Sequence, residues 1–351
     1  MNAVKGDIHK LQSDLSQVCE TFKLQSQSDL LHWISPLGIP YWAAYEKAQS
    51  LIWGDTGEWL AKTREYERWR SNKGLFCMQG ASGTGKTVLS SGLIGYLFEE
   101  ASSAEVGEKE KKKLILYFFF DYRDAARNTT TALYDSLMAQ LLEHHNLSAY
   151  DSAGSWYDGV VKVARDPKKL RHGQLTPQSR LGLLRDLLRS AALSASVYLV
   201  IDGCDECVNF TNADNICLFQ SLSAWARGDK MPLPGASCTS VGDCKDWTLS
   251  DDGVENEPGD LWVFLSSKHL PKELTTISFN LTLLDSSDET SKSHLKEEVE
   301  TYVTGRILAM GRTALASTGS KQSTEVAVRG DLELTSLGRD VVTKIVEISD
   351  G

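Results

Sequence analysis

A glycine-rich stretch near the start of the chain has the residue types and spacing that phosphate binding requires. Residues 80–87 read Gly-Ala-Ser-Gly-Thr-Gly-Lys-Thr, a complete G-x-x-x-x-G-K-[ST] pattern rather than an ordinary glycine-rich turn. Glycines allow a backbone turn in which successive N–H groups point at phosphate oxygens. Lys86 supplies a positive charge for the β- and γ-phosphates, and the Thr87 hydroxyl suits Mg²⁺. The residues predicted to bind a nucleotide are Gly80, Ala81, Ser82, Gly83, Thr84, Gly85, Lys86 and Thr87.

A cluster of acids further along the chain could complete such a site. Asp202 directly follows the apolar run 197–201, and Asp205 and Glu206 come shortly after it. A carboxylate at a strand end can hold Mg²⁺ opposite Thr87, so we predict Asp202 as a metal ligand. A neighbouring acid can orient or deprotonate an attacking water, which makes Asp205 and Glu206 candidates for hydrolysis. The alternative is a solvated acidic turn.

Two other groups of residues carry weaker signals. Lys268 follows the apolar run 261–265 and would contact the γ-phosphate, with an ordinary surface lysine as an equal alternative. Cys204 and Cys207 form a C-x-x-C pair without a second matched pair, so no zinc site is predicted. These cysteines are expected to be buried, and a redox pair is the alternative.

The phosphate pattern requires a strand before it and a helix after it, and both flanks agree. The apolar run 75–78 predicts a buried strand, and the apolar spacing within 88–98 predicts a helix. Further strands are predicted at 114–120, 197–201, 261–265 and 275–283, and further helices around 133–142, from 177, and at 215–227, 293–310 and 336–348. This alternation predicts an α/β fold, a mostly parallel sheet of about five strands with helices on both faces. Ligands bind at the carboxyl ends of such strands.

The chain divides into three parts. Residues 1–30 predict an amphipathic helix, which packs on its own domain or binds a partner. Residues 31–72 form a helical leader rich in tryptophan, expected to pack on the core rather than border the base. The tryptophans are Trp33, Trp42, Trp53, Trp59 and Trp69. Residues 73–351 form the core, in which 228–260 is expected to be an exposed insertion.

Composition narrows the class of protein. With 41% hydrophobic and 24% charged residues, the chain is ordinary for a soluble globular protein. A formal net charge of −10 disfavours binding to nucleic acid or to anionic membranes. No signal peptide is recognisable, and the longest apolar run is too short to span a bilayer. We therefore expect a cytoplasmic protein without a membrane span.

Several segments together resemble one family. The run Asp202–Cys207 reads D-G-C-D-E-C, which is similar to the Walker B motif of NACHT-type NTPases in the STAND class. Residues 33–36 and 54–60 resemble the leader of the nephrocystin-like N-terminal NACHT modules of fungal NOD-like receptors. Residues 117–121 and 265–268 resemble two strands of those modules. The resemblance covers roughly residues 30–350.

The resemblance implies a P-loop NTPase core of the ASCE type, in which another strand separates the two nucleotide strands. It implies binding of ATP or GTP with Mg²⁺, and slow hydrolysis that toggles a signalling switch in innate immunity or heterokaryon incompatibility. It also implies self-association or NOD-like-receptor partners. The chain departs from the family at Lys268, which replaces an arginine, and at the long segment 228–260. It stops at Gly351, before the expected winged-helix and repeat regions.

Three functions are therefore weighed. The first is a nucleotide-dependent signalling NTPase. The second is a non-catalytic interaction module that nucleotide stabilises, which the Lys268 departure and the expected missing regions favour. The third is a small-molecule kinase, which the paired acids disfavour because they suit water activation, and for which no arginine-rich lid is found.

Overall fold

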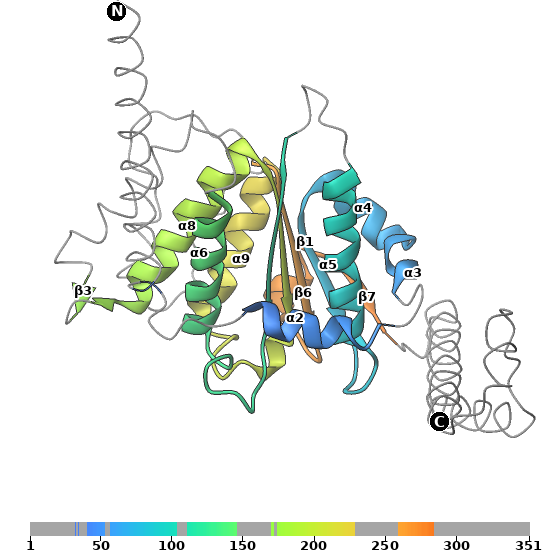
Figure 1. Ribbon diagram of the computed structural model, residues 1–351, viewed down its shortest axis with the longest axis horizontal. Coiled ribbons are helices and arrows are strands. Elements are labelled where there is room, and N and C mark those ends of the chain that lie inside the picture. The colour runs from blue at the N-terminus through green and yellow to red at the C-terminus, as the bar shows by residue number, and fades with distance from the viewer. Residues whose placement is uncertain are drawn as a thin grey trace, which may run out of the picture.

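A five-stranded parallel sheet is at the centre of the fold (Figure 1). The computed structural model of the chain describes residues 32, 34, 41–52, 57–103, 111–145, 170–171, 174–228 and 259–283. The strands follow the order β2 (Lys113–Phe119), β5 (Ser196–Asp202), β6 (Leu261–Ser267), β1 (Gly74–Gln79) and β7 (Phe279–Thr282). Every neighbouring pair is parallel, so the predicted α/β class is confirmed. Strand β6 separates β1 from β5, as the resemblance implies.

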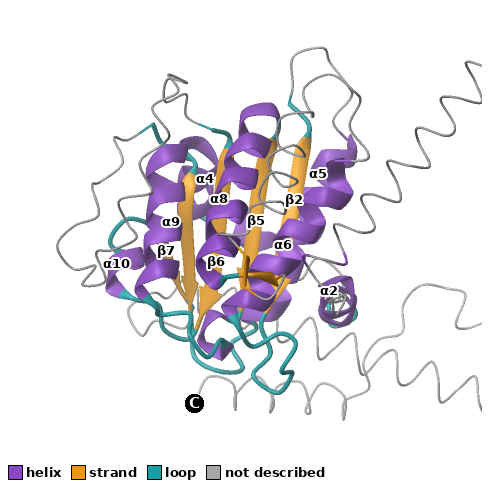
Figure 2. Cartoon of the chain, turned by 90° about the vertical axis from the view of Figure 1, so that its left-hand side faces the viewer, coloured by secondary structure: helices purple, strands orange, loops and turns teal. Residues whose placement is uncertain are grey.

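Helices cover both faces of the sheet, as Figures 1 and 2 show from two sides. One face carries α6 (Thr130–His145), α8 (Pro177–Ser194) and α9 (Ala213–Ala226). The other carries α3 (Glu58–Ala61), α4 (Arg64–Asn72) and α5 (Lys86–Ser103), with α2 (Tyr41–Gln49) against α5 and β2. The smaller elements are the strands β3 (Leu170–Arg171) and β4 (Gln174–Leu175), the 3₁₀ turn η1 (Cys204–Glu206) and the helix α10 (Lys272–Thr275).

The strands are buried because successive side chains enter different hydrophobic clusters on the two faces. Leu75 and Cys77 of β1 belong to the cluster under α6, α8 and α9, whereas Phe76 and Met78 belong to the cluster under α3, α4 and α5. A strand with apolar neighbours on both faces reads as a continuous apolar run, which is why the sequence identified these strands. The most central strand, β6, is buried along its whole length.

The tryptophan-rich leader packs on the core where the structure describes it. Trp69 is fully buried, and its indole N–H donates to the carbonyl oxygen of Gly74 at 3.0 Å. Trp59 is buried in the same cluster, and Trp42 is 48% exposed. The prediction of core packing is therefore confirmed for Trp59 and Trp69.

Local sequence signals predict the start of α8 correctly and the start of β7 wrongly. The hydroxyl of Thr176 accepts the backbone N–H of Ser179 at 3.1 Å and caps α8, as the Thr-Pro pair predicts. The strand predicted at 275–283 is wrong in its first part, because α10 begins after Pro271 and buries Leu274. The side-chain amide of Asn280 donates to the carbonyl oxygen of Thr275 at 2.6 Å, and the strand begins only at Phe279.

Some predictions fall outside the described residues. These are the helix within 1–30, most of the insertion at 228–260, and the helices at 293–310 and 336–348. Within the part that is described, no helix has both the length and the apolar character that crossing a membrane requires.

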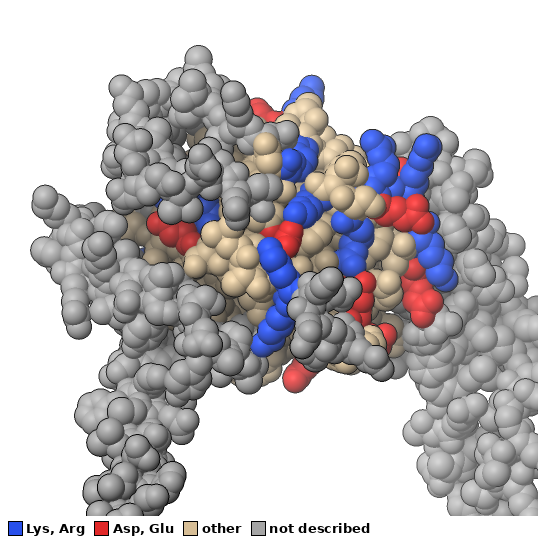
Figure 3. Space-filling view, turned by 90° about the horizontal axis from the view of Figure 1, so that it is seen from above, with Lys and Arg blue, Asp and Glu red and all other residues tan. Residues whose placement is uncertain are grey.

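Basic side chains gather at the amino edge of the sheet, which Figure 3 views from above. Asp260, just before β6, forms ion pairs with Lys73 and Lys111, the second at 2.8 Å. Glu100 on α5 pairs with Arg70 and with Lys113 at 2.7 Å and 3.3 Å. Asp260 therefore joins the segments that precede β1, β2 and β6, whereas Glu100 joins α5 to α4 and to the start of β2. Partly exposed pairs of this kind contribute little each.

A buried ion pair joins α6 to α8 and gives a stability prediction. The Nε of Arg180 lies 2.7 Å from Oδ1 of Asp135, with side chains 11% and 10% exposed. Arg180→Met is expected to lower the free energy of unfolding by about 3 kcal/mol, because it leaves a buried carboxylate without its cation. Urea unfolding at pH 8 measures this loss.

The same pair predicts a pH dependence and a rescue. Burial raises the pKa of Asp135 to about 6 even though Arg180 lowers it, so the folded state binds a proton more tightly than the unfolded state. Stability contributed by this group is therefore lost as pH rises from about 4 to about 6, and Arg180→Met should cost less at pH 5 than at pH 8. Adding Asp135→Leu should restore stability. A double variant no more stable than Arg180→Met would contradict this account.

Candidate functional site

Residues 80–87, the predicted phosphate loop, lie at the carboxyl edge of the sheet, between β1 and α5. Gly83 and Gly85 have φ angles of 85° and 81°, in the left-handed region where residues with a Cβ are strained. Helix α5 begins at Lys86, so its unpaired N–H groups and positive dipole end face the loop. The structure thus places the predicted residues 80–87 in one turn at a helix N-terminus. Phosphate binding by this turn stays a prediction.

Lys86 lies folded over the loop. Its ammonium donates to the carbonyl oxygens of Gly80 and Ala81 at 2.7 Å and 2.8 Å. Both partners are neutral, so the positive charge of Lys86 is not cancelled by an ion pair there. Burial raises the pKa of Asp202, and the positive charge of Lys86 partly opposes this rise. The turn therefore combines a cation with the start of helix α5, which suits an anion such as a phosphate group.

Asp202, the last residue of β5, meets Thr87 of α5 across the sheet edge. The Thr87 hydroxyl donates to Oδ2 of Asp202 at 2.7 Å. The Ser90 hydroxyl donates to Oδ1 at 2.7 Å, and the Ser266 hydroxyl also donates to Oδ1. Asp202 is 3% exposed, and this burial raises its pKa, although the three hydroxyls lower it. The structure therefore brings together the two residues predicted as metal ligands.

A hydroxyl beside a carboxylate suits Mg²⁺, which prefers oxygen ligands and usually takes only one or two carboxylates from a protein. Within the described ranges, no three His, Cys, Asp or Glu side chains gather closely enough to hold a metal ion themselves. The donor set of Thr87 and Asp202 fits a metal that a substrate phosphate would also ligate. Metal binding itself stays a prediction.

Sequence reasoning missed two hydroxyls of this site. Ser90 lies one helical turn after Thr87 on the same face of α5, a spacing that could have identified it. Ser266 directly follows the apolar run 261–265, and its hydroxyl donates to Asp202 and accepts the backbone N–H of Gly203 at 3.3 Å. Both serines are fully buried and hold the carboxylate of Asp202 in place.

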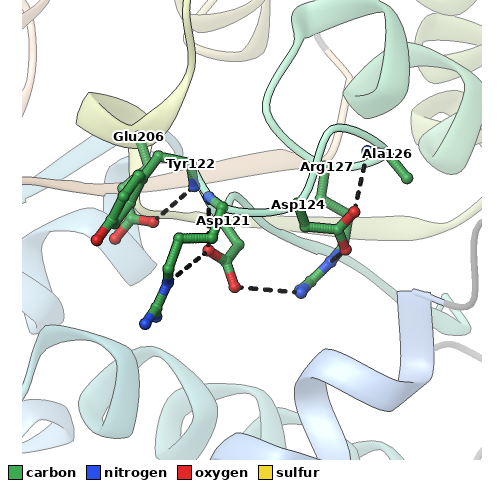
Figure 4. A network of polar contacts seen from close by, with 7 residues as sticks. Asp121, Tyr122, Asp124, Ala126, Arg127 and Glu206 are labelled. Carbon is green, nitrogen blue, oxygen red and sulfur yellow. Dashed lines mark hydrogen bonds and ion pairs between the residues drawn. The ribbon is translucent and has the colours of Figure 1, made fainter.

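Glu206 lies on η1, directly after β5, and faces the loop that follows β2 (Figure 4). Its Oε2 accepts the backbone N–H of Tyr122 at 3.1 Å. Burial raises the pKa of Glu206, the Tyr122 bond lowers it, and the negative charges of Asp121, Asp205 and Asp202 raise it further. A carboxyl group with a raised pKa is a better proton acceptor once it is ionised.

Arginines hold Asp121 beside Glu206. Asp121 Oδ1 lies 3.3 Å from Nε of Arg123, and Oδ2 lies 3.4 Å from a terminal nitrogen of Arg127. Arg127 also pairs with Asp124 at 2.7 Å, so the loop is fixed by its own charges, as Figure 4 shows. The network places Tyr122 where its N–H meets Glu206.

Asp205 points to a different element from Glu206. Its Oδ1 accepts the backbone N–H of Lys268 at 2.7 Å, and the Ser267 hydroxyl lies 3.1 Å from the same oxygen. The Lys268 residue is exposed, and the contact described for it is through its backbone. The contact of Lys268 with a γ-phosphate stays a prediction, as does the part of Asp205 in hydrolysis.

Cys204 on η1 and Cys207, directly after it, are buried free thiols. Burial raises the pKa of Cys204 and of Cys207. Thiols that stay protonated are poor nucleophiles, so the geometry supports the buried interpretation over a redox pair.

One comparison with known proteins identifies a family. Residues 55–232 match the family model described as Nephrocystin 3, N-terminal. The match covers just over half of the chain and includes the phosphate loop, β2, β5 and the acidic turn. No curated protein matches the chain.

Proposed function

The chain belongs to the nephrocystin 3 N-terminal family, and from that premise we propose that it is a nucleotide-binding signalling switch of the NACHT type. In this proposal it binds ATP or GTP with Mg²⁺ and hydrolyses the nucleotide slowly. The observation that supports it most directly is the 2.7 Å contact between Thr87 and Asp202 beside the glycine-rich turn. Thr87 and Asp202 are far apart in the sequence, and their contact brings together two groups that suit a phosphate and a metal ion.

Binding would use the turn and Lys86. Backbone N–H groups of the loop and of the first turn of α5 would point at the phosphate oxygens. Lys86 would exchange its two carbonyl partners, Gly80 and Ala81, for the β- and γ-phosphates. Mg²⁺, when bound, would neutralise charge that develops on the phosphate oxygens. Thr87 and Asp202 are the residues that would hold it, with Ser90 and Ser266 fixing the carboxylate.

Hydrolysis would depend on Glu206. Its carboxylate would accept a proton from the attacking water while the water oxygen bonds to the γ-phosphorus. The bond from the γ-phosphorus to the oxygen that bridges it to the β-phosphorus would break, which releases the nucleoside diphosphate and inorganic phosphate. Arg123 and Arg127, the two arginines of this network, are engaged by Asp121. At position 268 the resemblance to NACHT modules implies an arginine, and the chain has a lysine. Slow turnover fits a site in which the described arginines of this network are already paired with an acid and do not stabilise the charge of the transition state.

The proposal includes a cytoplasmic location and a protein partner, either a second copy of the chain or a protein of the NOD-like receptor type. A second function is a non-catalytic module that nucleotide stabilises. It is favoured by one observation, the exposed lysine at position 268. Lysine lacks the guanidinium fork that binds phosphate through two hydrogen bonds.

Phosphate release by the full chain separates these functions. With γ-labelled ATP or GTP and Mg²⁺, the switch should release inorganic phosphate slowly and in a protein-dependent way. Nucleotide that stays bound without turnover would instead identify the non-catalytic module. Transfer of the label to a small-molecule acceptor would identify a kinase. Absence of binding to both nucleotides would overturn the proposal.

A further inference from the structure

The two neighbouring acids of η1 have different partners, which divides their roles. Glu206 accepts a hydrogen bond from the loop after β2, whereas Asp205 accepts one from the end of β6. We propose that Asp205 is a positioning residue, which holds the Ser267–Lys268 peptide and, through this peptide, the start of the phosphate loop. The expected effect of Asp205 on nucleotide binding rests on the proposed function. The contacts of Asp205 themselves do not depend on that function.

A single peptide unit connects the acidic turn to the phosphate loop. The N–H of this unit belongs to Lys268 and donates to Oδ1 of Asp205 at 2.7 Å. The C=O of the same unit belongs to Ser267 and accepts the N–H of Gly80 at 3.2 Å. Gly80 is the first residue of the phosphate loop. Because a peptide unit is planar and rigid, moving one end of this bridge moves the other.

Strand order explains why the bridge exists at this point. β6 lies between β5 and β1, so its carboxyl end is the part of the sheet adjacent to both nucleotide strands. β6 ends at Ser267, which is fully buried and fixed in position. Its hydroxyl lies 3.1 Å from Oδ1 of Asp205 and 2.7 Å from the carbonyl oxygen of His269. The hydroxyl has a single proton to donate, and the carbonyl oxygen is the nearer acceptor. The Lys268 N–H is therefore the main donor to Asp205.

The chemistry of the contact gives a distinguishing variant. Asparagine keeps a side-chain oxygen that accepts the Lys268 N–H, but it cannot take up a proton as a carboxylate does. Alanine loses both properties. If Asp205 positions the bridge, Asp205→Asn should behave like the wild type and Asp205→Ala should not. If Asp205 is the acid that activates water, both variants should fail together.

Amide hydrogen exchange of the nucleotide-free protein tests the geometry alone. Asp205→Ala is expected to speed exchange at Lys268 about tenfold, because a hydrogen bond to a charged acceptor is lost, with a smaller increase at Gly80. Asp205→Asn should change exchange at Lys268 less than about threefold. Asp186→Ala, which removes an exposed acid from α8, is the matched control and should change neither amide. Unchanged exchange at Lys268 in Asp205→Ala would overturn the inference.

Nucleotide kinetics test the consequence. Asp205→Ala should lower kcat/KM for the triphosphate about tenfold, mainly through KM, because the loop loses its support. Asp205→Asn should retain kcat/KM within about threefold. Hydrolysis lost in Asp205→Asn to the same extent as in Glu206→Gln would overturn the inference and leave the proposed function standing. If the wild-type protein bound no nucleotide, the proposed function would be contradicted. The hydrogen-exchange experiment would still decide whether Asp205 holds the Ser267–Lys268 peptide.

Discussion

Glu206→Gln is expected to slow phosphate release at least about 100-fold, because loss of a general base typically costs that much. Nucleotide affinity should change less than about threefold, since glutamine has the same size and keeps an oxygen that accepts a hydrogen bond. That oxygen can still accept the N–H of Tyr122, which lies 3.1 Å from Glu206. The variant should therefore bind nucleotide and hold it.

Single-turnover phosphate release and equilibrium binding, measured on the same preparation, check this result. Glu58→Gln on α3 is the matched control, because Glu58 is an exposed glutamate that forms an ion pair with Lys62. The pKa of Glu206 is raised, so this carboxyl group ionises at a higher pH than an ordinary one. We therefore expect the increase of the hydrolysis rate with pH to occur in a correspondingly higher pH range. Asp121→Asn removes a neighbouring negative charge and should move this rise to lower pH. Hydrolysis unaffected by Glu206→Gln would exclude Glu206 from the mechanism.

Lys86→Ala is expected to weaken nucleotide binding by up to about 100-fold. A hydrogen bond between charged groups contributes about 3 kcal/mol at most, and 1.4 kcal/mol is a factor of ten in affinity. Lys86 is the cation that lies over the loop, and its two partners in the described structure are neutral carbonyl oxygens. The alanine variant therefore removes the charge without leaving an unpaired acid.

Titration with Mg²⁺ and each purine triphosphate measures this loss, and urea unfolding without nucleotide shows whether the fold is intact. Lys62→Ala at the end of α3 is the control, because that lysine has a side chain 75% exposed. The control should bind as the wild type does. Equal affinity in Lys86→Ala and the wild type would mean that nucleotide, if bound, does not use the phosphate loop.

Much of the fold could be predicted from the sequence because its signals are local. The strand β1 and the helix α5 follow from an apolar run, a glycine pattern and helical spacing within a short stretch. The cap at Thr176 is equally local. The order of the strands is not local. Only the resemblance implied that another strand would separate β1 from β5, and the structure shows that this strand is β6. The error at 275–278 arose because α10 ends at Thr275 and a turn follows it. The side-chain amide of Asn280 donates to the carbonyl oxygen of Thr275, a contact that the residue pattern does not predict.

The candidate site could be predicted in part. The sequence paired Thr87 with Asp202 by chemical type, and the structure places them in contact although they are 115 residues apart. It could not distinguish Asp205 from Glu206, because adjacent acids differ only in the partners that the fold supplies. Tyr122 contributes a backbone N–H, which any residue type offers, so no sequence pattern could have identified it.

Calorimetric titration of the full wild-type chain with ATP and with GTP, each with and without Mg²⁺, tests the central claim most directly. The account predicts saturable one-to-one binding of at least one of these nucleotides, and tighter binding when Mg²⁺ is present, because Thr87 and Asp202 would then share the metal with the phosphates. No detectable binding of either nucleotide in the presence of Mg²⁺, by a protein shown to be folded, would contradict it.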